Sequence, residues 1–152
     1  MGPFIRLATA KDQEALVLLY RDLNPGEVKA EPRVFAAIYK EILSSRYFHL
    51  VVAEQGKLLV GTCYLNIIPN LSRSASPYAV LENVVVASQV RRQGVGKAIV
   101  AFALALAWER GCYKVMLQTG SKKEATHRFY RSCGFSPNEK FAFVARPPAC
   151  GG

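Results

Sequence analysis

The sequence has few residues of the kinds that hold metals or form disulfide frameworks. Its 152 residues include four cysteines, none of them spaced as a Cys-x-x-Cys pair, and only two histidines, His49 and His127. A structural zinc site needs four such ligands at close and regular spacings. We therefore expect neither a metal site nor a disulfide framework, and a reducing, cytoplasmic setting fits best.

Long apolar runs are also missing. The longest, at 98–108, is far shorter than the roughly 20 residues that a membrane-spanning helix needs. Arg6 and Lys11 interrupt the beginning of the chain before a secretory signal peptide could form. We therefore expect no partner in the membrane.

Acidic residues are scarce relative to basic ones. The chain has 20 lysines and arginines against 11 acidic residues, which gives a formal net charge of +9. This excess favours anionic partners such as nucleic acid, a membrane surface or a phosphorylated cofactor, although an inert basic surface has the same composition. The charge is spread along the chain, and no RNA-binding signature or helix-turn-helix spacing accompanies it. Nucleic acid is therefore not the favoured partner.

What the chain does have is a core and a regular order of strands and helices. Hydrophobic residues make up 51% of it, enough for one domain, which we place at 1–146 with a loose C-terminal tail at 147–152. Alternation and β-branched content predict strands, whereas helical spacing, proline, glycine and capping residues predict helices. The predicted strands are 4–8, 47–54, 57–68, 78–87, 113–119 and 139–145. The predicted helices lie between Thr9 and Leu23, from Pro32 to about Ile42, at about 97–110 and at 123–133.

This order of elements predicts an α/β fold. Strand hairpins and crossover helices occur together, so we expect a mixed sheet with helices on both faces. Thr9 and Asp12 form a capping pair before the first helix, and Pro32 is suited to the first turn of the second.

The segment VRRQGVGKAIV (90–100) has the composition of a phosphate site between a strand and an apolar helix. A P-loop needs serine or threonine where Ala98 stands, and the dinucleotide fingerprint needs a glycine where Ile99 stands. What remains is a helix start whose unpaired amides and dipole favour an anion. Because Gly94 and Gly96 would let that anion approach the backbone, the segment predicts a pyrophosphate site.

Two motifs carry a resemblance to a known family. Arg91-x-x-Gly94-x-Gly96, after a valine-rich strand, resembles motif A of the GNAT superfamily of acetyl-CoA-dependent N-acetyltransferases. HRFYRSCGF (127–135) is similar to the second signature of that family, a helix ending in Phe-Tyr and followed by Gly-Phe. The order of elements matches as well, so the resemblance covers about 4–145. It implies a GNAT-type fold with a mostly antiparallel sheet, and acetyl-CoA as the acyl donor.

The resemblance also implies a coenzyme A site formed largely by the main chain. In the family, the amides of motif A hold the pyrophosphate, and the preceding strand pairs with the pantetheine arm like an added strand. The implied residues are Val84, Val85, Val86, Arg91, Arg92, Gln93, Gly94, Val95, Gly96 and Lys97. Lys122 stands where the family often has asparagine; lysine cannot reproduce an amide's donor and acceptor, but it could reach the phosphates.

Glu82 is the candidate general base. Transfer of an acyl group to an amine requires that an ammonium lose a proton. Glu82 is the only acidic residue within 55–108, and family members similar to this chain often carry a glutamate on this strand that acts through water. Alternation puts Glu82 on one face with Val80, Val84 and Val86. Burial there would favour the protonated form, as suits a base acting near neutrality. The alternative is a structural carboxylate, hydrogen-bonded to a nearby loop or paired with Arg73.

Tyr130 is the candidate general acid. It matches the family tyrosine whose hydroxyl faces the coenzyme sulfur, and a phenol with the ordinary pKa of about 10 is protonated at pH 7. The alternative is a packed tyrosine that only orients the thioester. A Cys133 nucleophile is not favoured, because His127 lies six positions away and points to a different face of the helix. His127 is better explained as a residue on the helix surface or a wall of the acyl site.

The acceptor is the least determined part of the hypothesis. In this fold the cleft would be bordered by 23–33, by 69–77 and by the last hairpin, with Asn70 and Arg73 as candidate substrate-binding residues. Arg73 could pair with an acidic group of the substrate or remain a solvated loop charge. We expect a small-molecule amine, with a protein or peptide amine as the alternative. A basic nucleic-acid-binding module and an acetyl-CoA-binding domain without turnover are the rival classes, and a homodimer is a family expectation.

Overall fold

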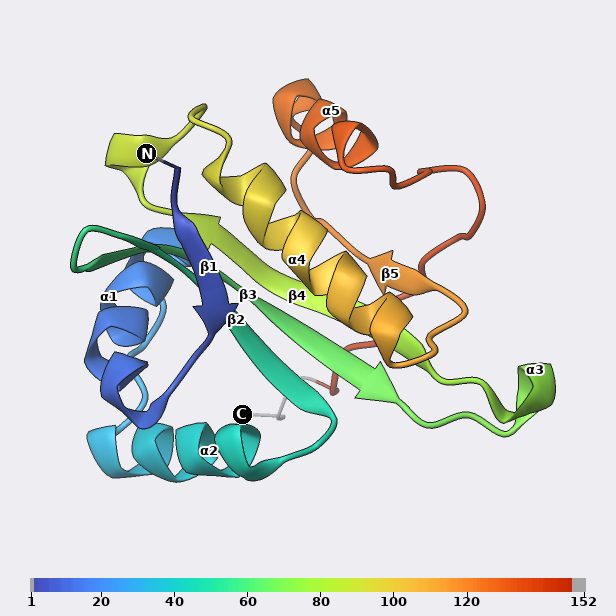
Figure 1. The fold of residues 1–152 in the computed structure, drawn as a ribbon, viewed down its shortest axis with the longest axis horizontal. Helices are drawn as coiled ribbons and strands as arrows, with labels where there is room; N and C mark the ends of the chain where they lie inside the picture. The colour runs from blue at the N-terminus through green and yellow to red at the C-terminus, as the bar shows by residue number, and fades with distance from the viewer. Residues whose placement is uncertain (1, 149–152) are drawn as a thin grey trace. The chain divides into compact units, whose positions relative to one another are not determined.

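The computed structural model describes residues 2–148, which fall into two compact units that divide after Leu117. The first unit contains a five-stranded sheet in the order β1-β2-β3-β4-β5 (Figure 1). The strands are β1 (Phe4–Leu7), β2 (Phe48–Gln55), β3 (Leu58–Ile68), β4 (Tyr78–Val86) and β5 (Val115–Leu117). β1 to β4 pair antiparallel, and β4 pairs with β5 in parallel. The predicted mixed, mostly antiparallel sheet is therefore confirmed.

The helices follow the predicted order. In the first unit they are α1 (Gln13–Leu23), α2 (Pro32–Ser44), the single turn α3 (Ser72–Ala75) and α4 (Val95–Glu109), with 3-10 turns η1 (Ala10–Asp12) and η2 (Ser88–Val90). The second unit contains α5 (Glu124–Ser132). Pro32 occupies the first turn of α2, as predicted. The single domain predicted over 1–146 stays a prediction, and most of the predicted tail, 149–152, lies outside the described residues.

The strand predicted at 139–145 is wrong. This segment has no regular secondary structure, and Phe141 and Phe143 are 91% and 93% exposed. Alternating apolar residues are compatible with a strand, but a strand also needs a neighbour for its main-chain hydrogen bonds. The part of the second unit that the structure describes, 118–148, has no other strand to supply one.

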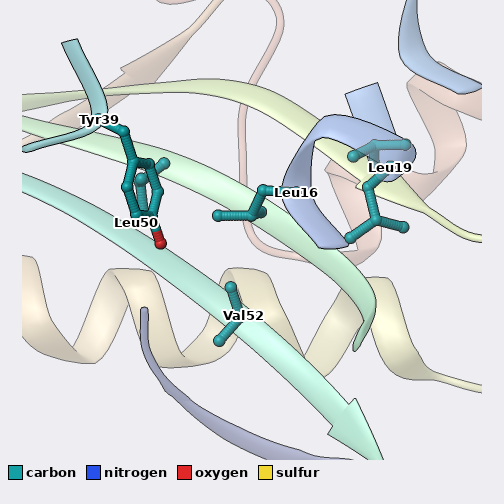
Figure 2. Packing of buried hydrophobic residues seen from close by; sticks show 6 residues of the cluster. Leu16, Leu19, Tyr39, Leu50 and Val52 are labelled. Atoms are coloured by element: carbon teal, nitrogen blue, oxygen red, sulfur yellow. The ribbon is translucent and has the colours of Figure 1, made fainter. Parts of the chain in front are cut away.

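Helices cover both faces of the sheet. On one face, Leu16 and Leu19 of α1 and Tyr39 of α2 form a core cluster with Leu50 and Val52 of β2 (Figure 2). Val51 and Ala53, which alternate with these strand residues, are also fully buried. A strand whose successive side chains are all buried must be covered on both sides.

The second face is covered by α4, which approaches the sheet closely at Gly61 of β3. A Cβ atom placed on Gly61 would lie 2.7 Å from Cδ1 of Ile99 and 3.4 Å from Cγ1 of Val95. Both α4 residues are buried. The missing side chain therefore lets α4 pack against the middle of the sheet.

An ion-pair network joins β1 and β2 to η1. The Arg6 guanidinium donates to both carboxylate oxygens of Asp12, at 2.7 and 2.9 Å, and to Oε2 of Glu54 at 2.8 Å. The Thr9 amide donates to the Asp12 carboxylate at 2.7 Å, which confirms the predicted capping pair. The hydrogen bonds from Arg6, and next those from Thr9, lower the pKa of Asp12 to about 2. The entry to α1 is therefore fixed by a charge that is satisfied within the protein.

Candidate functional site

β4 contains one extra residue next to Glu82. Glu82 pairs with Tyr64 of β3, whereas Val85 pairs with Thr62, so three steps along β4 correspond to two steps along β3. Asn83 has φ 52°, in the left-handed region that asparagine tolerates better than most residues. This is a β-bulge. Since residues paired across a sheet share a face, Glu82 and Val85 lie on the same face.

The structure corrects two sequence predictions about Glu82. Alternation holds up to Asn83 and then reverses, so Val84 and Val86 lie on the face opposite Glu82 and not beside it. Glu82 is also exposed and not buried, so the argument from burial is wrong. None of the ion pairs within 2–148 involves Glu82, and Arg73 lies 5.7 Å from the ring centre of Tyr113. The carboxylate is therefore accessible to an amine or a water.

β4 and β5 separate from each other next to the bulge. β4 pairs with β5 only from Ala79 opposite Val115 to Leu81 opposite Leu117. Beyond Leu81, β4 is paired with β3 on one side, and no strand among the described residues pairs with its other side. The main chain of Val84, Val85 and Val86 lies in this part of β4, while the Val85 side chain is buried in the core. Such a free edge can accept an extended chain as an added strand.

α4 follows this free edge in the sequence after η2 and a short loop, and Gly94 is its N-cap residue. Gly94 is exposed, has φ 83°, and would have no atom within 4 Å of an added Cβ. The amide of Ala98 is the one that bonds back to the Gly94 carbonyl, at 3.0 Å. The amides of Val95, Gly96 and Lys97 therefore belong to the unpaired first turn of the helix. They form an accessible group of donors at the positive end of a helix dipole.

Exposed cations surround this helix start. Arg91, Arg92 and Lys97 are exposed, and no acidic residue within 2–148 forms an ion pair with them. Nε of Arg91 donates to the Val86 carbonyl at 3.1 Å, which ties the loop to the end of β4. Gln93 donates to the Gln89 carbonyl at 3.3 Å. The loop is thus held by its own side chains while the positive charge remains at the surface.

The loop that contains the predicted substrate residues has an unusual conformation. Arg73, Ser74 and Ala75 have φ values of 56°, 57° and 57°, so the turn α3 is left-handed. The side-chain amide of Asn70 donates to the carbonyls of Ser72 and Ser76, at 3.0 and 3.3 Å. Asn70 is therefore engaged within the loop, and Arg73 is exposed. The sequence did not indicate this turn, because none of its residues is glycine.

The second unit places the remaining predicted residues around α5. Tyr130 is half-buried, with ring-centre distances of 5.0 Å to Phe129 and 6.2 Å to Phe135. Nε2 of His127 lies 2.6 Å from the Ser121 carbonyl, which ties the helix to the segment before it. Lys122 is exposed in that segment. His127 is thus engaged with the main chain, at a half-buried position.

The buried cysteines are held as thiols. Burial raises the pKa of Cys63 to about 12 and also raises the pKa of Cys112. Because the thiolate is the reactive form, neither residue is suited to act as a nucleophile. In the described part of the chain, no three His, Cys, Asp or Glu side chains are grouped so that they could hold a metal ion. Among the described helices, none is both long enough and apolar enough to cross a membrane.

Comparisons with known proteins bear on the family and the fold of the chain. The sequence profile of the acetyltransferase (GNAT) family matches residues 8–135. A glucosamine 6-phosphate N-acetyltransferase from Trypanosoma brucei brucei is 33% identical over 82 residues, which are 54% of each chain. The match thus spans about half the length of that relative.

Solved structures extend the likeness to nearly the whole chain. A provisionally named acetyltransferase from Agrobacterium tumefaciens str. C58 has a TM-score of 0.89 and 38% identity, over 95% of this chain and 99% of that one. Glucosamine-6-phosphate N-acetyltransferase from Arabidopsis thaliana has a TM-score of 0.82 and 25% identity, over 98% of this chain and 100% of that one.

Proposed function

The chain belongs to the acetyltransferase (GNAT) family, and from this we propose that it transfers the acetyl group of acetyl-CoA to a primary amine. The observation that carries the proposal is the free edge of β4 beyond Leu81, which is followed along the chain, after η2, by the unpaired amides at Gly94. The first suits an extended amide-containing arm, and the second suits a pyrophosphate. Coenzyme A has both parts in this order.

The residues present fit that coenzyme. Val84, Val85 and Val86 would pair with the pantetheine arm through their main chain. The motif A loop would hold the pyrophosphate through the amides of 93–97, and Arg91, Arg92 and Lys97 would add positive charge. Lys122 is proposed as a further phosphate contact on the basis of the sequence resemblance. The bound coenzyme supplies the activated acetyl thioester.

Glu82 and Tyr130 are proposed as base and acid. Glu82 is exposed beside the bulge, so it can take a proton from the acceptor ammonium directly or through a water. The role of Tyr130 rests on its place in HRFYRSCGF, where a phenol would give its proton to the leaving thiolate. Direct attack by the amine then needs no acyl-enzyme, which agrees with the buried thiols of Cys63 and Cys112.

We propose a small-molecule amine as the acceptor. Two of the similar proteins described above are named as N-acetyltransferases of glucosamine 6-phosphate, a small amine that carries a phosphate. Arg73 is exposed and without an ion pair among residues 2–148, so it could contact an anionic group of such an acceptor. Asn70 would act indirectly by holding the loop that carries Arg73.

Calorimetry with acetyl-CoA tests the coenzyme site. Gly94→Val adds a side chain at the helix start in a strained conformation and should weaken binding at least tenfold. Gly111→Val is the matched control, because Gly111 also has a positive φ of 78° but follows the opposite end of α4. Absence of acetyl-CoA binding to the unmodified protein, or equal weakening by both substitutions, would contradict the proposal.

A thiol-release assay over a panel of amines tests the chemistry and the acceptor. The panel should include glucosamine 6-phosphate, an aminoglycoside and a peptide with a free amine. Glu82→Gln and Tyr130→Phe should each lower kcat about 100-fold or more. Glu109→Gln and Tyr113→Phe, both at exposed positions, serve as controls. If Glu82→Gln turns over at the normal rate, Glu82 is not the base, and turnover of the peptide alone would favour a protein acceptor.

A further inference from the structure

His49 is a buried side chain with an unpaired ring nitrogen. It lies near the beginning of β2, is 7% exposed, and forms a hydrogen bond through its ring to the main chain of Arg46. Its Nε2 has no hydrogen-bond partner among the described residues. A buried polar atom without a partner costs about 1–3 kcal/mol. Such an atom is a reason to look for a group that could occupy the space beside it.

That space is a hollow of about 250 Å³ within the first unit. The polar residues of its lining include Arg46, His49 and Arg110, and the apolar residues include Leu7, Leu43 and Leu50. Its volume corresponds to roughly eight water molecules at about 30 Å³ each, which is enough for a small organic molecule. A second hollow, of about 270 Å³, shares Arg46 and Arg110 with the first.

The basic side chains that line the hollow have no compensating carboxylate. Neither Arg46 nor Arg110 forms an ion pair with any residue in the described part of the chain. The Arg46 guanidinium lies over the Tyr47 ring, whose centre is 5.1 Å away. Burial, and next the charge of Arg110, lower the pKa of the His49 imidazole. An oxyanion between the two guanidinium groups would accept their hydrogen bonds. The neutral imidazole donates from its other ring nitrogen to the Arg46 main chain, so Nε2 would donate to that oxyanion only after it takes up a proton, which the negative charge favours.

This hollow is separate from the proposed coenzyme site. Arg110 follows the C-terminal end of α4, and Gly94 precedes its N-terminal end. The 15 residues of α4 separate the two by about 22 Å. The helix dipole disfavours an anion at the C-terminal end, so attraction there must come from the two guanidinium groups.

We propose that this hollow binds a small organic carboxylate. The carboxylate would lie between Arg46 and Arg110, next to Nε2 of His49, and a short apolar body would contact Leu7 and Leu43. The planar guanidinium matches a carboxylate in geometry, and the apolar residues of the lining favour an anion with a hydrocarbon part over an inorganic one. The proposal does not depend on the proposed acetyltransferase activity, because the two sites share no residue.

The test is a titration of the full chain with sodium butyrate, followed by NMR on the ring signals of His49. Saturable shifts should occur with butyrate, and butylamine or sodium chloride at equal ionic strength should not produce them. Arg110→Gln should weaken butyrate binding at least tenfold, whereas Arg21→Gln, at an exposed position on α1, should leave it unchanged. Saturating acetyl-CoA should not displace butyrate.

Three results would overturn the proposal. No saturation with butyrate would show that the hollow is not a carboxylate site, and equal affinity in Arg110→Gln would show that the guanidinium is not part of it. If inorganic phosphate binds as tightly as butyrate, the apolar residues of the lining do not contribute to binding, which contradicts the proposal. Competition with acetyl-CoA would contradict the separation of the two sites.

Discussion

Arg6 and Arg110 lie in the same unit and carry the same charge, yet their surroundings are opposite. Arg6 contacts two carboxylates, Asp12 and Glu54, and Asp12 is 6% exposed. Arg110 lines a hollow with Arg46 and His49 and has no ion pair within residues 2–148. A charge that is paired within the protein stabilises the fold. A group of positive charges without partners in the protein is available to bind an anionic ligand.

Removal of each arginine should separate these roles most clearly. Arg6→Met leaves the Asp12 carboxylate nearly buried and without its guanidinium, so we expect a loss of about 3 kcal/mol in the free energy of unfolding. Arg110→Met should change it by less than about 0.5 kcal/mol, because no ion pair is broken. Urea unfolding of both variants measures the difference, and equal losses would remove the distinction.

Acid should weaken the Arg6 network first at Asp12. Its pKa is about 2 in the folded protein against 3.8 for a free side chain, so the unfolded chain binds the proton more readily. The stabilisation is therefore complete above pH 3.8 and is lost as the pH falls toward 2, by on the order of 2 kcal/mol. Thermal unfolding between pH 5 and pH 2 should show this loss. Asp12→Asn should flatten the profile, and a profile as steep as the original would contradict the assignment.

His49 should give a smaller effect in a different pH window. Burial, and next the charge of Arg110, hold the pKa of His49 below its ordinary value of 6.5. The unfolded chain then binds a proton before the folded protein does, so stability should fall as the pH drops below about 6.5, by at most about 1.4 kcal/mol per pH unit. Arg110→Gln should make this slope shallower. An unchanged slope would show that Arg110 does not act on His49.

The smallest effect is expected at the ion pair between Arg131 and Glu124 on α5. The two side chains are 44% and 63% exposed, so solvent screens their interaction. Glu124→Gln should cost less than about 0.5 kcal/mol in thermal unfolding. A cost close to that of Arg6→Met would mean that burial does not decide the strength of these pairs.

The sequence predicted the features that depend on nearby residues. The start of α4 could be inferred because Gly94 and Gly96 stand between a strand and an apolar helix, and the capping pair because Thr9 and Asp12 are three residues apart. The Arg6 network could not, since Glu54 is 48 residues away in sequence. The hollow beside His49 could not either, because its lining comes from β1, α2, β2 and the end of α4.

The errors have related causes. The alternation at 139–145 suggested a strand, but alternation does not state whether a pairing partner exists. Glu82 was expected to be buried because its neighbours are apolar, but it is exposed beside the bulge at Asn83. The presence of Asn83 did not predict the bulge, since asparagine is also common in ordinary turns.

The bulge at Asn83 acts on β4 as a frameshift acts on a coding sequence. Before it, even-numbered positions share the face of Glu82; after it, the odd-numbered Val85 does. Deletion of Asn83 would remove the bulge and keep Val85 opposite Thr62, whereas an extended Asn83 without the bulge would turn Val85 out of the core that it now shares with Leu16 and Tyr39. Inward and outward positions of this strand can therefore be inferred for a relative only if the alternation is shifted by one residue at Asn83.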